Sequence, residues 1–203
     1  MKIAVIGASG NAGSRITAEL ARRGHAITAI ARNPGKIADL PNVTAQAGDV
    51  MDQAALTRLL AGHDVAISSV HFLDSDPAKL IGAAKDSKVG RYLVVGGAGS
   101  LEVAPGVRLV TTPGFPAQYK AEAEKGAAFL DLLRQEKALN WTFLSPSALF
   151  TAGERTARFR LGTDQLLTAA DGKSWISFED FAVALADEIE RPAHIRARFT
   201  VGY

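Results

Sequence analysis

The chain has 203 residues, 47% of them hydrophobic and 22% charged, a composition that fits an ordinary globular protein and excludes a disordered or fibrous one. The net charge is only +2, with no cysteine among the residues; this excludes disulfides, thiolate metal sites and cysteine nucleophiles. Basic residues are scattered along the chain, so we expect no nucleic-acid partner.

The N-terminus runs from Met1-Lys2 directly into an apolar segment and a glycine-rich loop, without the features of a signal peptide. No segment reaches the roughly 18 apolar residues that a membrane span needs. We therefore expect a cytoplasmic protein with no membrane partner.

The first half of the chain alternates short apolar runs with segments of helical period. This rhythm predicts βαβ units around a parallel sheet, with helices on both faces of a doubly wound α/β fold. The expected strands are Ile3–Ile6, Ala26–Ala31, Val43–Ala47, Val65–Val70 and Arg91–Val95. The expected helices are Ser14–Arg23, Gln53–Leu60 and Pro77–Ser87.

The second half is less regular. Residues 102–117 contain three prolines and no clear period, which predicts a long irregular loop that forms a wall of a substrate pocket. We expect a single domain over residues 1–203, with about 145–203 as a small substrate-side extension. Its later elements are a helix at Ala121–Gln135, a strand at Trp141–Leu144, a helix at Phe178–Glu190 capped by Ser177 with Asp180 three residues on, and a closing strand at Arg198–Val201.

A glycine-rich loop follows the first strand and opens the first helix: Gly7, Ala8, Ser9, Gly10, Asn11, Ala12 and Gly13. In this position it predicts a Rossmann-type dinucleotide site, because a pyrophosphate lies against backbone N–H groups at a helix N-terminus. Gly7 permits the turn, Gly10 lets the pyrophosphate approach, and Gly13 lets the helix pack closely on the strand. The alternative is a tight turn without a ligand.

The end of the second strand predicts which dinucleotide binds. An NAD site would carry a carboxylate there for the ribose hydroxyls, but the sequence has Arg32, with Asn33 and Lys36 close by. A guanidinium clasps a 2′-phosphate, so these residues favour NADP(H). Arg32 as a solvated surface charge is the alternative.

Three more groups lie at the carboxyl ends of predicted strands, where doubly wound sheets bind ligands. Asp49 closes the third strand where it could accept a hydrogen bond from adenine; it could equally cap the next helix, for which Asp52 is the better candidate. The full set of additional cofactor candidates from these strand ends is Asp49, Val50, Ser68, Ser69, Val70, Gly96 and Gly97.

With these motifs the chain resembles the atypical short-chain dehydrogenase/reductase superfamily, and in particular its small NAD(P)H-binding members, the NADH-flavin reductase-like or NmrA-like proteins. Biliverdin IXβ/flavin reductase is a more distant likeness. The segments on which this resemblance rests are residues 5–13, 31–34, 48–50, 140–147 and 176–182. The resemblance implies that Pro146 and Ser147 also border the cofactor, and that the nicotinamide lies at the end of the sheet. Some such proteins reduce flavins or quinones, and others are redox-sensing regulators without turnover.

Classical members of the superfamily carry a Tyr-x-x-x-Lys pair in which the lysine lowers the tyrosine pKa. Here Tyr119 is followed four residues on by Ala123, so that geometry is absent. The candidates for contact with the substrate are Tyr119, Lys120 and Ser100, although Tyr119 could equally pack on the preceding loop. His71 is a further polar candidate near the nicotinamide, and the alternative is an ordinary surface histidine. Glu122 and Glu124 are predicted to lie on a solvated helix face.

The leading hypothesis is an NADPH-dependent oxidoreductase that transfers hydride to a flavin, quinone or similar conjugated acceptor, because such a transfer needs mainly stacking and orientation. The alternative is a non-catalytic protein that senses the redox state of NADP(H). An epimerase or dehydratase ranks last, because sugar oxidation needs an effective base. The expected partner is the small-molecule acceptor, and a homodimer is left open.

Overall fold

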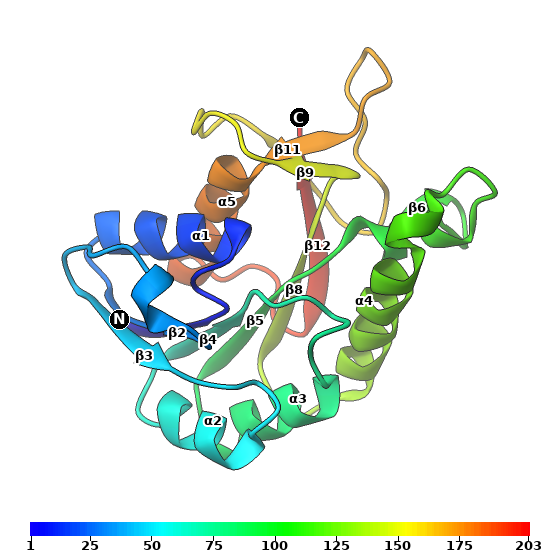
Figure 1. Cartoon of the computed structure of the whole chain (residues 1–203). Coiled ribbons are helices and arrows are strands. Elements are labelled where there is room, and N and C mark those ends of the chain that lie inside the picture. The colour runs from blue at the N-terminus through cyan, green and yellow to red at the C-terminus, as the bar shows by residue number, and fades with distance from the viewer.

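An eight-stranded sheet forms the centre of the computed structural model, which describes residues 1–203 (Figure 1). The spatial order is β10-β12-β8-β5-β4-β1-β2-β3, and all neighbouring strands are parallel except β10 and β12. The strand bounds are β1 (Lys2–Ile6), β2 (Ala26–Ala31), β3 (Val43–Ala47), β4 (Val65–Ser68), β5 (Arg91–Val95), β8 (Trp141–Pro146), β10 (Arg160–Gly162) and β12 (Ala197–Gly202). The predicted mostly parallel, doubly wound fold is confirmed.

Helices cover both faces of this sheet. On one face lie α1 (Asn11–Arg22) and α5 (Phe178–Glu190), and on the other α2 (Gln53–Leu60), α3 (Pro77–Asp86) and α4 (Ala117–Gln135) (Figure 1). Successive side chains of a strand point to opposite faces, so Ile3 and Val5 join the core under α1 and α5, whereas Ala4 and Ile6 join the other core. Burial on both faces explains why the central strands are apolar throughout.

The strand order reverses between β1 and β4. From β1 the chain proceeds outward to β2 and β3, then crosses back to β4 and continues to β5 and β8 on the other side. Adjacent crossovers of opposite direction leave a crevice at the carboxyl ends of the strands at this switch point. The glycine-rich loop, residues 7–13, leaves β1 at that crevice.

Two predicted helix caps are confirmed. The Asp52 side chain accepts a hydrogen bond from the Ala55 N–H at the start of α2, and Ser177 accepts one from the Asp180 N–H at the start of α5. Asp180 does not reach back to Ser177 as in a capping box; its carboxylate accepts hydrogen bonds from the N–H groups of Thr156 and Ala157.

Four predicted boundaries are wrong by two or more residues, among them the end of β8, which lies at Pro146 rather than Leu144 because the pairing with β12 continues to that residue. α1 begins at Asn11 rather than Ser14, because Gly13 allows the first turn to lie against the loop that precedes it. α4 begins at Ala117 rather than Ala121, because Pro116 occupies the cap position, where proline interrupts no helical hydrogen bond. β4 ends at Ser68 rather than Val70.

The segment 102–117 is also more ordered than predicted. It contains an antiparallel hairpin of β6 (Glu102–Ala104) and β7 (Val107–Arg108), whose turn includes Gly106 with φ +73°, followed by a 3₁₀ turn. Glu102 pairs with the distant segment 164–166 through its N–H and carbonyl. A local reading of the sequence misses this order because its partners lie some sixty residues away.

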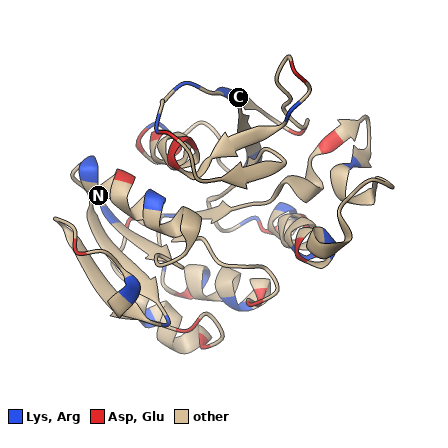
Figure 2. Ribbon diagram, turned by 45° about the horizontal axis from the view of Figure 1, so that its top comes forward, with Lys and Arg blue, Asp and Glu red and all other residues tan.

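The C-terminal part adds a small parallel pair, β9 (Leu149–Thr151) with β11 (Trp175–Ser177), above the carboxyl end of the sheet (Figure 1). In the view of Figure 2, positions of lysine and arginine are interspersed with positions of aspartate and glutamate along the ribbon. None of the five α-helices combines the length and apolar character that crossing a membrane requires.

Candidate functional site

Two positions of the glycine-rich loop have no room for any residue larger than glycine. Gly7 has φ +81°, and a Cβ on it would lie 2.1 Å from the carbonyl oxygen of Ser69. A Cβ on Gly13 would lie 2.1 Å from the carbonyl oxygen of Gly7. At Gly10 the only atom within 4 Å of such a Cβ is the same oxygen, at 3.3 Å. Gly7 and Gly13 are therefore needed by the protein's own packing, whereas Gly10 leaves space open toward solvent.

Beside that space, the start of α1 presents unpaired hydrogen-bond donors. The N–H groups of Asn11, Ala12 and Gly13 donate to no group in the chain, while Ser14 N–H begins the helical pattern by donating to Gly10. Ser9 and Asn11 are exposed. Free N–H groups at the positive end of a helix dipole attract an anion. The loop thus fits a phosphate group through its backbone.

At the end of β2, basic side chains stand free. Arg32 and Lys36 are exposed, and neither makes a hydrogen bond or an ion pair within the chain. Asn33 instead uses its side-chain oxygen to accept a hydrogen bond from the Gly35 N–H, which shapes the turn that follows β2. Two uncommitted cations at this edge of the sheet favour an anionic ligand there.

The chain after β4 lies directly against the glycine loop. Ser69 N–H donates to Ile6, and the Val70 Cγ1 atom is 3.0 Å from the position of a Cβ on Gly7. Ser68 itself is buried within β4. The structure therefore brings Ser69 and Val70 together with the phosphate cradle, as the sequence analysis expected of neighbouring strand ends.

Other cofactor candidates have structural partners. Asp49 is exposed and accepts a hydrogen bond from the Met51 N–H, and Val50 is half-buried against the core under α2 and α3. Gly96 must be glycine because a Cβ there would lie 2.2 Å from the Phe143 ring, whereas Gly97 has more room. Contact of these residues with a cofactor stays a prediction.

At the end of β8, both remaining candidates are buried. The Ser147 side chain is 1% exposed, and its hydroxyl donates to the carbonyl of Val201. Pro146 is buried as the last residue of β8. The Ser147 hydroxyl therefore joins β8 to β12, and its predicted contact with a cofactor is untested.

The three catalytic candidates do not form a connected group. Tyr119 is 62% exposed in the first turn of α4 and makes no side-chain hydrogen bond, and its neighbour Lys120 is also exposed and unpaired. Ser100 is buried and accepts a hydrogen bond of 3.4 Å from Arg198, whose pKa is lowered by burial although Asp164 opposes this. No hydrogen bond or ion pair joins the side chains of any two of the three candidates.

Sequence reasoning missed Glu122. Its carboxylate is not solvated as predicted; it accepts hydrogen bonds from the N–H groups of Phe72 at 2.7 Å and Leu73 at 2.9 Å. Glu124, two residues on, is exposed as predicted. The helical pattern of α4 gives no signal for this difference, because the partners of Glu122 lie about fifty residues earlier in the chain.

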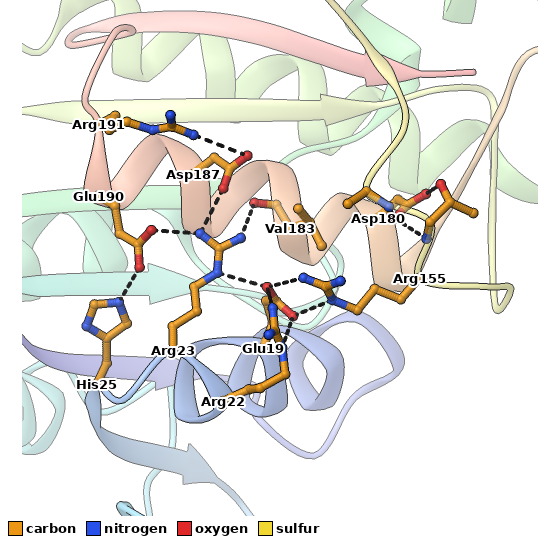
Figure 3. Close-up of polar contacts among 12 residues, drawn as sticks. Glu19, Arg22, Arg23, His25, Arg155, Asp180, Val183, Asp187, Glu190 and Arg191 are labelled. Atoms are coloured by element: carbon orange, nitrogen blue, oxygen red, sulfur yellow. Dashed lines mark hydrogen bonds and ion pairs between the residues drawn. The ribbon is translucent and has the colours of Figure 1, made fainter.

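A network of ion pairs joins α1 to α5 and to the loop 152–158 (Figure 3). Glu19 on α1 accepts hydrogen bonds from Arg22, Arg23 and Arg155. Burial alone would raise the pKa of Glu19, but these guanidinium groups outweigh it and hold the pKa far below its usual range. Arg23 also binds Asp187 on α5. The network therefore ties the C-terminal half of α1 to α5 and to the loop 152–158.

A surface hollow of about 430 Å³ lies between the β6–β7 hairpin and residues 165–168. Glu102, Val103 and Leu166 are among its lining residues. None of the predicted cofactor residues lines it. The segment 102–117 is expected to form the wall of a substrate pocket, and its hairpin does border a hollow. This hollow shares no lining residue with the glycine-rich loop at residues 7–13.

The sheet order, the crevice at the switch point and the glycine cradle define a nucleotide-binding protein of the Rossmann type. The family model described as NAD(P)H-binding matches residues 7–192. The chain belongs to this NAD(P)H-binding family, which confirms the resemblance found in the sequence.

Individual relatives span the whole chain. YwnB of Bacillus subtilis (strain 168), whose activity is uncharacterised, is 41% identical over 99% of this chain and 98% of its own. A proposed exported protein from Burkholderia pseudomallei is 46% identical with a TM-score of 0.90, covering 100% of both chains. A proposed NADH-flavin reductase from Streptococcus pneumoniae TIGR4 is 36% identical with a TM-score of 0.82, covering 100% of this chain and 99% of its own. In view of the Burkholderia name, a cytoplasmic location stays a prediction.

Proposed function

We propose that the protein is an NADPH-dependent oxidoreductase that transfers hydride to a flavin, quinone or similar conjugated acceptor. The observation that carries the proposal is the backbone cradle at Gly7–Gly13 with the unpaired guanidinium of Arg32 at the end of the neighbouring strand. Bound in this crevice, the dihydronicotinamide would supply the hydride.

The choice of NADPH rests on charge. In the register of β1 with β2, the end of β2 lies beside the strand from which the cradle leaves. An adenosine 2′-phosphate there would meet Arg32 and Lys36, both free to bind it, and no carboxylate on the same turn. A guanidinium binds phosphate through two parallel hydrogen bonds, so Arg32 would provide most of the selectivity.

The choice of a conjugated acceptor rests on what the site lacks and on one relative. Tyr119 and Lys120 are adjacent rather than four residues apart, so they cannot form the tyrosine-lysine pair that donates the proton when classical relatives reduce a carbonyl group. A flat acceptor stacked on the nicotinamide needs orientation more than a built proton donor. The relative from Streptococcus pneumoniae, named as a proposed NADH-flavin reductase, supports this class of acceptor.

Titration with each dinucleotide tests the cofactor choice. Wild-type protein should bind NADPH more tightly than NADH. Arg32→Ala should raise the Kd for NADPH by about 10- to 100-fold, as expected for loss of charge-assisted hydrogen bonds, and leave the Kd for NADH within about twofold. Arg58→Ala, which removes an exposed and unpaired arginine on α2, is the matched control. Equal affinities of the wild type for NADPH and NADH would refute the choice.

Turnover tests the reductase itself. NADPH oxidation is followed with FMN, FAD, riboflavin and a simple naphthoquinone under anaerobic conditions, and one equivalent of NADPH should be consumed for each two-electron reduction. Tight binding of NADPH without oxidation above background for any acceptor would refute the reductase proposal. That result would leave the redox-sensing alternative.

A further inference from the structure

The segment that follows β4 is clamped to α4 by one carboxylate. Each oxygen of Glu122 accepts a separate backbone hydrogen bond, one from Phe72 N–H and the other from Leu73 N–H, at 2.7 and 2.9 Å. Both bonds are charge-assisted, and such bonds are stronger than neutral ones. A carboxamide at this position would offer one oxygen and turn an NH₂ group toward the second N–H. Only a carboxylate satisfies both donors.

Side-chain packing reinforces the clamp. Phe72 is buried and meets Phe129 of α4 edge-on, with ring centroids 6.0 Å apart. Its ring fits where Gly126 lacks a side chain: a Cβ there would lie 2.6 Å from the ring. The same ring atom, Cε2, also lies 3.6 Å from a Cβ built on Gly97. Two backbone hydrogen bonds and the packing of the Phe72 ring therefore hold residues 72–73 against α4.

The position of residues 72–73 on α4 affects the residues just before them, which border the crevice at the carboxyl ends of the strands. Ser69 and Val70, which touch the Gly7 position, are separated from Phe72 by a single residue. That residue is His71, whose side chain is 83% exposed and lies 3.4 Å from the Glu122 carboxylate. β4 stands across the switch point from β2 and β3. Since the adenosine half of a bound dinucleotide would lie over the β1–β3 side, residues 69–71 would border its nicotinamide half.

We propose that Glu122 is a positioning residue for the nicotinamide half-site: by clamping Phe72 and Leu73 it holds Ser69, Val70 and His71 against the cofactor. The inference rests on the proposed binding of NADP(H), but not on the identity of the acceptor or on turnover. It assigns a function to a carboxylate on α4 that is outside the glycine motif and outside the tyrosine-lysine position.

The test compares a whole ligand with half of one. Glu122→Gln should raise the Kd for NADP⁺ by about tenfold, equivalent to about 1.4 kcal/mol, and leave the Kd for adenosine 2′-phosphate within about twofold, because that ligand has neither the pyrophosphate, which would lie beside Gly7, nor the nicotinamide half. Glu124→Gln, on the same helix but exposed, is the control and should change neither constant. A general loss of structure would weaken both ligands together.

A second variant reaches the same segment through a different contact. Gly126→Ala improves the intrinsic helix propensity of α4 but displaces the Phe72 ring, so it should reproduce the selective loss of NADP⁺ affinity. Glu122→Asp, which keeps the charge on a shorter side chain, should restore part of the affinity. If Glu122→Gln and Gly126→Ala bind NADP⁺ as the wild type does, the positioning role is refuted. If the wild type binds no dinucleotide, the proposed function fails with it.

Discussion

Substitution by alanine should have different effects at two glycines of the same loop, Gly13 and Gly10. Gly13→Ala places a methyl group 2.1 Å from the Gly7 carbonyl oxygen, more than 1 Å short of ordinary contact, against backbone that cannot rotate away. Gly10→Ala meets only that oxygen at 3.3 Å and otherwise faces open space. We expect Gly13→Ala to destabilise the fold, and Gly10→Ala to impair dinucleotide binding in a folded protein.

The magnitudes follow from these contacts. Overpacking of this kind costs about 1–3 kcal/mol, and alanine recovers about 0.5–1 kcal/mol of helix stability. Because the clash is with backbone, the upper half of the overpacking range applies, and the net loss of about 1–2.5 kcal/mol lowers the Tm of a chain of this size by about 2–10 °C. At Gly10, alanine fits the φ of −77° without strain, so the Tm should stay within about 2 °C. Its methyl group occupies the phosphate's approach to backbone, so the Kd for NADPH should rise at least about tenfold.

The assay is thermal unfolding of each variant without ligand, together with calorimetric titration of NADPH. Gly114→Ala is the control, because nothing lies within 4 Å of a Cβ at that position, and it should leave both measurements unchanged. A Gly10→Ala protein that binds NADPH with wild-type affinity would refute the assignment of this loop as the pyrophosphate cradle. A Gly13→Ala protein as stable as the wild type would refute the packing argument.

Three further predictions concern residues outside the loop. The pKa of Glu19 is lowered in the folded state, so its contribution to stability is complete above its ordinary pKa of 4.5 and is lost as the pH falls below that value. Glu19→Gln should therefore lower the unfolding free energy at pH 7 and flatten its decline in acid, and chemical denaturation at several pH values that shows parallel declines would contradict this. Tyr119→Phe should keep kcat for a flavin acceptor within about twofold, because the exposed hydroxyl has no hydrogen-bond partner; a loss of a hundredfold, within the usual contribution of a general acid, would make Tyr119 the proton donor. Ser177→Ala removes the cap of α5 together with the hydrogen bonds of the same hydroxyl to Glu154 and Tyr203, and should lower the Tm by at least about 2 °C with an unchanged Kd for NADPH; a Tm equal to that of the wild type would show that these bonds contribute nothing.

Local sequence determined the fold and the glycine-rich loop that we propose as the cradle for the pyrophosphate. Alternating apolar runs and helical periods predict the parallel sheet, because a strand buried on both faces must be apolar throughout. The cradle at Gly7, Gly10 and Gly13 is equally local: its turn, its backbone donors and its helix start lie within seven consecutive residues. The Asp52 and Ser177 caps depend on partners three residues away, so the sequence predicts them as well.

Tertiary structure alone decided the rest, because the interactions join residues far apart in the chain. Glu122 and Glu124 are equivalent in the sequence of an amphipathic helix, yet only Glu122 meets the segment after β4. Ser147 follows a strand end like the other cofactor candidates, but its hydroxyl donates a hydrogen bond to the carbonyl of Val201 in the neighbouring strand β12. A sequence pattern fixes which face of an element is buried. Which distant backbone donor a side chain meets is set only when the elements pack.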